Sequence, residues 1–118
     1  MNKSELLNRT KSFAVDVFKL VDRFPKSKAS DVVSYQLLKA ASSVAANYRA
    51  TNRAKSKADF IHKLTVVVEE ADECHFWLSF SLEVGIVKAN PVTDKLIDEA
   101  NQLVAIFTSS VKTSRAKP

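Results

Sequence analysis

The sequence predicts an all-α protein folded as an antiparallel, up-down-up-down four-helix bundle. Only one glycine and three prolines occur in 118 residues, and 46% of the residues are apolar. All-β architectures are therefore disfavoured, because they need glycine, asparagine and proline at frequent turns. Apolar residues also recur at helical spacing in four segments, which fit a single domain of residues 1–118. We expect helices at about residues 4–24, 31–51, 57–84 and 91–113.

The first segment presents Leu7, Ala14 and Val21 on one helical face. Pro25 follows it directly, and proline cannot continue a helix. The connection after it is short and polar. We expect Ser30 to cap the next helix, because a serine side chain accepts hydrogen bonds from the free backbone N–H groups of the first turn.

The second segment has an apolar face at intervals of four, four, three and four residues, formed by Val33, Leu37, Ala41, Val44 and Tyr48. Residues 40–46 are nearly all small, which favours close approach of a neighbouring helix. Tyr48 shares the core face, so we expect it to be buried. Asn52 could take the left-handed conformation that closes this helix.

The third segment begins at a pattern that resembles a capping box, with Ser56 as the cap and Asp59 in place of the usual Glu or Gln. Its core face alternates steps of four and three residues, which is typical of bundles. The lone cysteine, Cys74, lies on that face; we expect a buried thiol, and no intramolecular disulfide can form. Gly85 is the expected end of the helix.

The last turns of the third segment carry more apolar surface than one bundle can bury. Apolar side chains point to almost every side there, and a helix that is apolar all round must be buried all round. We therefore predict a homo-oligomer in which another copy covers this surface. The predicted interface residues are Phe76, Trp77, Phe80 and Val84.

The fourth segment opens with Asn90 as N-cap and Pro91 as first helical residue. Leu96, Leu103 and Phe107 continue the heptad-like spacing, and the tail from Lys112 to Pro118 should fray. The three connections are short, and short connections make successive helices antiparallel neighbours. This is the basis of the up-down-up-down prediction.

Positive charge is concentrated in the first half of the chain. The net charge is +5, and residues 1–57 hold 12 Lys and Arg against four Asp and Glu. In an up-down bundle, the N-terminus, the second connection and the C-terminal tail share one end. This predicts a basic cap made of Lys3, Arg49, Arg53, Lys55, Lys57, Lys112, Arg115 and Lys117.

The basic cap is the candidate ligand-binding surface, because clustered Lys and Arg attract nucleic-acid phosphates. The candidate nucleic-acid-binding residues are Arg49, Arg53, Lys55, Lys57, Lys112 and Arg115. A second interpretation is purely structural. Cations near helix C-termini offset the helix dipole, and many basic surfaces are simply solvated.

The sequence contains no complete set of catalytic or metal-binding residues, so we expect no enzyme activity, no metal and no cofactor. The pairs Asp59/His62 and Asp72/His75 lie on one segment, about 20 Å apart along the axis and roughly on opposite faces, so they cannot share a metal. Cys74 and His75 are adjacent and diverge by about 100°, so they cannot form a nucleophile pair. A single glycine excludes a Gly-rich phosphate loop.

Four stretches of the sequence carry a family resemblance: Gln36 to Arg49 (QLLKAASSVAANYR), Ser56 to Phe60 (SKADF), Glu70 to Glu73 (EADE), and Trp77-Leu78. They resemble the four-helix-bundle protein family related to proteins encoded in intervening sequences of bacterial 23S ribosomal RNA genes. The resemblance covers about residues 13–107. Many members have Glu-Ala or Glu-Gly where this chain has Ala50-Thr51.

The resemblance implies a cytoplasmic bacterial protein that assembles as a ring, typically a homopentamer, with no established enzymatic activity. A relative of the family, the accessory variability determinant of diversity-generating retroelements, forms a basic barrel that binds nucleic acid and a reverse transcriptase. The expected partners of this chain are therefore further copies of itself and RNA or DNA.

Two functions follow as hypotheses. The first is nucleic-acid binding through the basic cap, and the alternative is a protein–protein interaction scaffold that binds another protein and no nucleic acid. We expect no membrane partner, because the N-terminus has no signal-peptide pattern and no apolar run approaches about 18 residues. The expected location is the cytoplasm.

Overall fold

The structure, a computed structural model, describes residues 1–118 as four α-helices without strands, in an elongated molecule of 50 × 23 × 21 Å. This confirms the all-α prediction. A single 3-10 turn, η1, follows the second helix. The elements are α1 (Lys3–Val21), α2 (Lys28–Ala50), η1 (Thr51–Arg53), α3 (Lys57–Glu83) and α4 (Pro91–Ala116).

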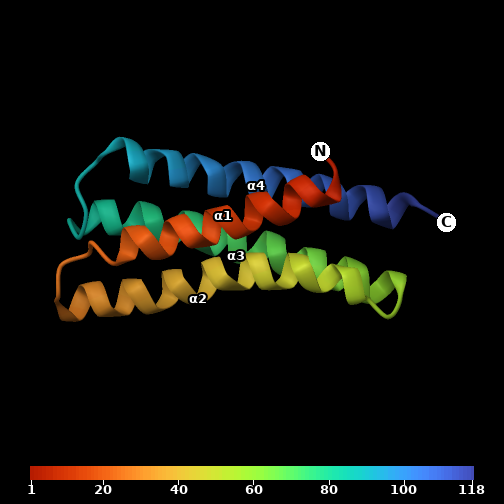
Figure 1. The fold of residues 1–118 in the computed structure, drawn as a ribbon, viewed down its shortest axis with the longest axis horizontal. Helices are drawn as coiled ribbons and strands as arrows, with labels where there is room; N and C mark the ends of the chain where they lie inside the picture. The colour runs from red at the N-terminus through yellow and green to blue at the C-terminus, as the bar shows by residue number, and fades with distance from the viewer.

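The helices lie side by side along the long axis of the molecule (Figure 1). The neighbouring pairs are α1 with α2, α2 with α3, α3 with α4, and α1 with α4, the last being the least extensive. Both chain termini lie at the same end as the connection between α2 and α3 (Figure 1). The other two connections lie at the opposite end.

The start of α2 differs from the prediction. Ser27, not Ser30, caps this helix: its backbone is extended and its hydroxyl accepts a hydrogen bond from the backbone N–H of Ser30 at 3.0 Å. Ser30 is buried inside the first turn. Both serines satisfy the local pattern, and the earlier one lets Lys28 to Ser30 join the helix, so the Ser30 prediction was wrong.

The end of α2 also differs from the prediction. No residue other than glycine has a positive φ, so Asn52 does not adopt the left-handed conformation. The chain instead tightens into η1, where the Thr51 hydroxyl donates to the carbonyl oxygen of Tyr48 at 2.6 Å. A 3-10 turn satisfies the last carbonyls without a left-handed residue.

The predicted cap of α3 is confirmed, with one difference. The Ser56 hydroxyl accepts from the backbone N–H of Asp59 at 3.0 Å. The Asp59 carboxylate accepts from the Lys63 ammonium at 2.8 Å and from the backbone N–H of Lys55 at 2.9 Å, one residue before the cap. These bonds, that of Lys63 first, lower the pKa of Asp59.

Gly85 ends α3 as predicted, with a φ of 78°. The Gly85 N–H donates to the Leu82 carbonyl at 3.1 Å, and the Ile86 N–H donates to the Ser81 carbonyl at 3.0 Å. This pair of bonds is the Schellman motif. At the start of α4, Asn90 caps the helix and Pro91 is its first residue, again as predicted. The helix continues to Ala116, so the prediction that the tail frays from Lys112 was wrong.

One continuous core of 20 buried apolar residues runs through the bundle. Tyr48 is buried in it, with its ring centroid 5.0 Å from that of Phe107 on α4. Burial raises the pKa of the Tyr48 hydroxyl. Cys74 is also buried, as predicted.

Candidate functional site

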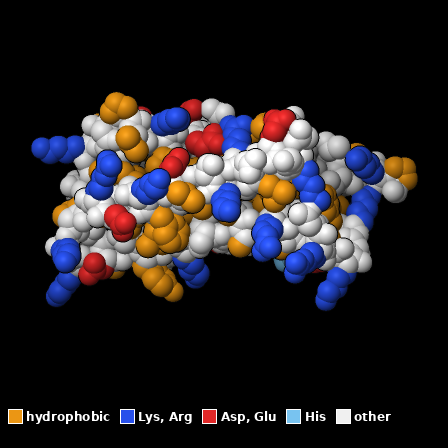
Figure 2. Space-filling model, in the orientation of Figure 1, with side chains coloured by type: hydrophobic (Ala, Val, Ile, Leu, Met, Phe, Trp, Pro, Cys, Tyr) orange, Lys and Arg blue, Asp and Glu red, His pale blue; other side chains and the backbone are white.

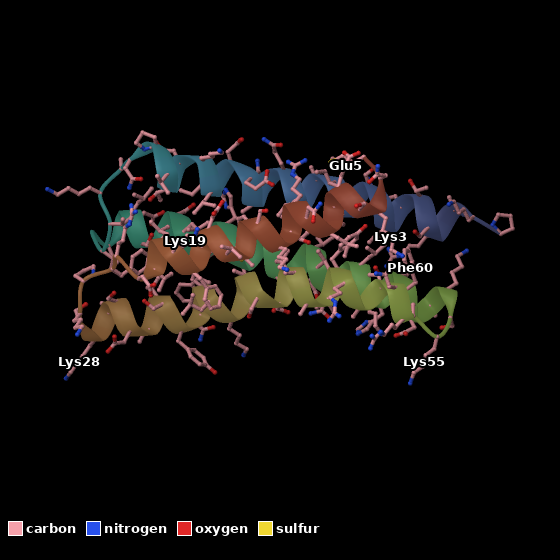
Figure 3. All side chains as sticks on the ribbon, viewed as in Figure 1. Lys3, Glu5, Lys19, Lys28, Lys55 and Phe60 are labelled. Atoms are coloured by element: carbon pink, nitrogen blue, oxygen red, sulfur yellow. The ribbon has the colours of Figure 1, made fainter.

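The structure brings all eight residues of the basic cap to one end of the molecule (Figure 1). Lys3 and Lys57 begin α1 and α3, Arg49 lies in the last turn of α2, and Arg53 lies in η1. Lys112 and Arg115 belong to the last turns of α4. Lys3 and Lys55 are seen at this end in Figure 3, opposite Lys28. All eight side chains are exposed.

The cap cations form no ion pair with a carboxylate. The two ion pairs in the molecule are Arg9–Glu99 and Lys63–Asp59. Within the cap, the Lys57 ammonium donates to the backbone carbonyl of Lys117, which is a neutral acceptor and does not cancel the charge of Lys57. In Figure 2, blue Lys and Arg side chains lie over the whole visible face, and at this end, on the right of the view, few red Asp and Glu side chains lie among them.

Helix dipoles account for only part of the cap. Arg49, Lys112 and Arg115 lie at helix C-termini, where a cation is favourable. Lys3 and Lys57 lie at helix N-termini, where the positive end of the dipole disfavours a cation. Dipole compensation therefore does not explain why these two positions are basic.

A shallow pocket of about 290 Å³ beside the cap was not predicted from the sequence. Its apolar floor includes Tyr48 and Phe60, and its rim holds hydroxyl groups of α4, including Ser109 and Thr113. The Asn47 amide, which lies next to Tyr48 in the chain, already donates to the Ser43 carbonyl at 2.9 Å. The Tyr48 ring is therefore too buried to stack on a base, and the amide N–H groups of Asn47 are already bonded to Ser43.

The four predicted interface residues divide into two pairs. Phe76 and Val84 are exposed, at 53% and 47% of their surface, whereas Trp77 and Phe80 are partly buried. The Phe76 ring stacks on Phe80 at 5.5 Å and meets Trp77 edge-on at 4.9 Å. The indole N–H of Trp77 is enclosed without an acceptor. The aromatic side chains therefore form one cluster on the outside of α3.

A groove between α1 and α2 is the largest concave surface described, with a volume of about 950 Å³. The sequence did not predict it, because it depends on which faces of the two helices meet. Val15 and Phe18 are 43% and 45% exposed. Their position outside the predicted core face of the first segment is the signal in the sequence for an apolar surface on α1. We define the α1–α2 groove by its lining residues, which include Leu7, Lys11, Val15, Phe18, Lys19, Asp22, Ala45, Ala46 and Arg49.

The side chains outside the cap offer no metal-binding cluster. No group of three or more His, Cys, Asp or Glu side chains is placed to hold a metal ion. Burial, with smaller contributions from Glu70 and Glu73, raises the pKa of the Cys74 thiol. No helix combines the length and apolar character needed to cross a bilayer.

Comparison with known proteins gives a family and a fold. Residues 2–109 match the family described as 23S rRNA-intervening sequence protein. The fold is similar to a crystal structure of a protein of unknown function from the S23 ribosomal protein family of Bacteroides thetaiotaomicron, with a TM-score of 0.84 and 25% identity over 95% of this chain and 99% of that chain. No curated protein matches the chain.

Proposed function

We propose that this chain, which belongs to the 23S rRNA-intervening sequence protein family, is a non-enzymatic protein that binds the phosphate backbone of RNA or DNA through its basic cap. One observation carries the proposal. Eight exposed cations lie at one end of the bundle, and none of them is paired with a carboxylate.

The physical basis of the proposed binding is counterion release. Each Lys or Arg that neutralises a phosphate frees condensed cations from the nucleic acid, so affinity falls steeply as salt rises. Lys3 and Lys57 support the proposal most directly, because the helix dipoles disfavour cations at their positions. Binding of this kind reads the backbone and carries little sequence preference.

The proposal includes the predicted antiparallel, up-down-up-down bundle and its assembly into a ring-like homo-oligomer. The placement of successive connections at alternate ends of the molecule supports the first part (Figure 1). The exposed Phe76 and Val84 support the second. For the copy number we propose a pentamer, as the family resemblance implies, and for the location the cytoplasm.

The aromatic cluster of α3 favours a second candidate function, a scaffold that binds another protein. Exposed apolar clusters usually mark interaction surfaces, and Phe76 is exposed over 53% of its surface. The two functions respond differently to salt. An apolar protein interface should hardly change or should strengthen as salt rises, whereas phosphate binding should weaken.

The test is fluorescence anisotropy with labelled single-stranded RNA and duplex DNA at about 50 and 200 mM salt. We compare the parent chain with a cap variant, Arg53→Gln with Arg115→Gln. The matched control, Lys26→Gln with Lys28→Gln, removes the same charge from exposed positions at the opposite end. Binding that the cap variant loses and the control keeps is the expected result. Absence of binding at the lower salt, or equal loss in both variants, overturns the proposal.

A further inference from the structure

The outside of α3 and its C-cap present a stripe that is acidic at one end and apolar at the other, which we call the α3 stripe: Glu69, Glu73, Phe76, Phe80 and Val84. Steps of four, three, four and four residues keep these side chains on one helical face. The two carboxylates come first along the helix, and the apolar side chains follow. Glu69, Glu73, Phe76 and Val84 are exposed, and nothing within the chain covers their outer side.

The α1–α2 groove has the opposite net charge, because Lys11, Lys19 and Arg49 line it against the single acid Asp22. Along α1, a cation again precedes the exposed apolar side chains. Lys11 comes first along α1, and the exposed apolar side chains of Val15 and Phe18 follow. Ala45 and Ala46 of α2 line the groove with small side chains, which do not fill it. Arg49 adds a cation on the α2 side, in the last turn of α2, and α2 ends at the same end of the molecule at which α1 begins (Figure 1).

The two surfaces match in register. Lys11 precedes Phe18 by seven residues, and Glu69 precedes Phe76 by the same number, which is about 10 Å along a helix in both cases. Both α1 and α3 begin at the end that holds the chain termini (Figure 1). When two copies stand side by side with the same end up, the cation and aromatic of one can therefore align with the acid and aromatics of the other at a single relative height.

We propose that the α1–α2 groove of one copy receives the α3 stripe of the next copy. This inference rests on the homo-oligomer included in the proposed function, and it specifies which surfaces form the contact. The contact joins two different surfaces, so it is heterologous, and such contacts build a closed ring when the rotation between copies closes. Opposite charges at one level and apolar groups at the next fix the direction and height of docking.

The arrangement also relates self-association to the basic cap. Copies that dock side by side with the same end up place all their caps on one rim of the assembly. Arg49 lies where the groove meets the cap, so it borders both surfaces. The opposite docking, with α1 antiparallel to α3 of the next copy, would set Lys11 against the apolar part of the stripe and would separate the caps.

The first test uses two chains, each with one damaged surface. Phe18→Asp places a charge in the groove, and Phe76→Asp places one in the stripe. Both side chains are about half exposed, so neither change disturbs the core. Mass is measured by light scattering after size-exclusion chromatography, and Val32→Asp, which is 59% exposed and outside both surfaces, is the control. Far-UV circular dichroism verifies that each variant is folded.

The parent chain and the control should be oligomers, and each damaged chain alone should be a monomer. An equimolar mixture of the two damaged chains should form a dimer, because the intact stripe of one still fits the intact groove of the other. We expect each single change to weaken association about 30-fold or more, as at an interface hot spot. A mixture that remains monomeric overturns the proposed pairing.

The second test is a charge exchange at the level of Lys11. Lys11→Glu and Glu69→Lys should each weaken association, and both changes in one chain should restore it. If Phe18→Asp and Lys11→Glu leave the oligomer intact while Phe76→Asp dissociates it, the groove is not the receiving surface and only this inference fails. If the parent chain is a monomer at all concentrations, the proposed homo-oligomer fails as well.

Discussion

Arg9 makes the most extensive polar contact between α1 and α4. Its guanidinium donates to both carboxylate oxygens of Glu99 at 2.7 Å and to the side-chain oxygen of Gln102 at 2.7 Å. The hydrogen bond to Glu99 raises the pKa of Arg9. A two-pronged bond of this kind is stronger and more directional than a single ion pair. It holds α1 against α4, the neighbour with which α1 has its less extensive contact.

We predict that Arg9→Met lowers the free energy of unfolding by about 1 kcal/mol, because it removes a partly buried, bidentate ion pair. The methionine keeps part of the apolar stem of the arginine. Lys95→Met on α4 is the control, since Lys95 is exposed and forms no ion pair. Urea unfolding followed by circular dichroism checks the difference. Equal midpoints for the two variants would contradict this role of Arg9.

Cys74 should make the stability of the folded protein decrease at alkaline pH. Its thiol pKa is raised in the folded state by burial, so the folded protein keeps the proton after the unfolded chain has lost it. A thiol with a raised pKa in the folded state contributes its full stability at pH values below the pKa of the unfolded chain. This contribution is lost as the pH rises from there toward the pKa of the folded state. We expect the free energy of unfolding to fall from about pH 8.5 upward, by about 1.4 kcal/mol for each pH unit.

Urea titrations between about pH 7.5 and 9.5 test this prediction, since the window stays below the ordinary pKa of tyrosine. Cys74→Ala is the comparison, because it removes the thiol and leaves a small apolar side chain. The parent chain should lose stability across this window relative to the variant. Parallel pH profiles would show that the buried thiol does not cause the decrease.

The helix ends are fixed by single residues with special geometry. Ser27, Ser56 and Asn90 each accept a backbone N–H of the first turn through a side-chain oxygen. Gly85 alone uses a positive φ, and it forms the Schellman end of α3. These ends set the lengths of the connections and therefore which residues reach each end of the bundle.

We predict that Gly85→Ala destabilises the protein by about 1 kcal/mol, which is the cost of a left-handed conformation for a residue with a Cβ atom. No atom lies within 4 Å of the position that this Cβ would take, so a steric clash does not contribute. Gly85→Asn should cost less, because asparagine tolerates this conformation. Thermal unfolding of both variants checks the order, and an alanine variant as stable as the asparagine variant would contradict the account.

The positions of the helices could be predicted from the sequence, whereas the residues that cap and end them could be predicted only in part. Apolar spacing and the pairs Ser56/Asp59 and Asn90/Pro91 were sufficient to predict where α3 and α4 begin. The choice between Ser27 and Ser30 was not predictable, because both have the same capping chemistry. Arg9 and Glu99 are 90 residues apart, and only the packing of α1 on α4 brings them together.

The whole molecule separates its surfaces by charge and position. The basic cap occupies one end, the α3 stripe one side, and the α1–α2 groove another side. The cap could be predicted from the sequence because it depends only on the order of the helices along the chain. The groove could not, because it depends on how α1 rotates about its axis when it packs on α2.

The most direct test of the central claim is the salt dependence of binding to duplex DNA. For the parent chain, the logarithm of the binding constant should fall linearly with the logarithm of salt concentration, by about 0.9 for each phosphate neutralised. Arg53→Gln with Arg115→Gln should reduce this slope by about two. Lys26→Gln with Lys28→Gln should leave it unchanged. Equal slopes for all three chains, or a slope near zero for the parent chain, would contradict a phosphate-binding cap.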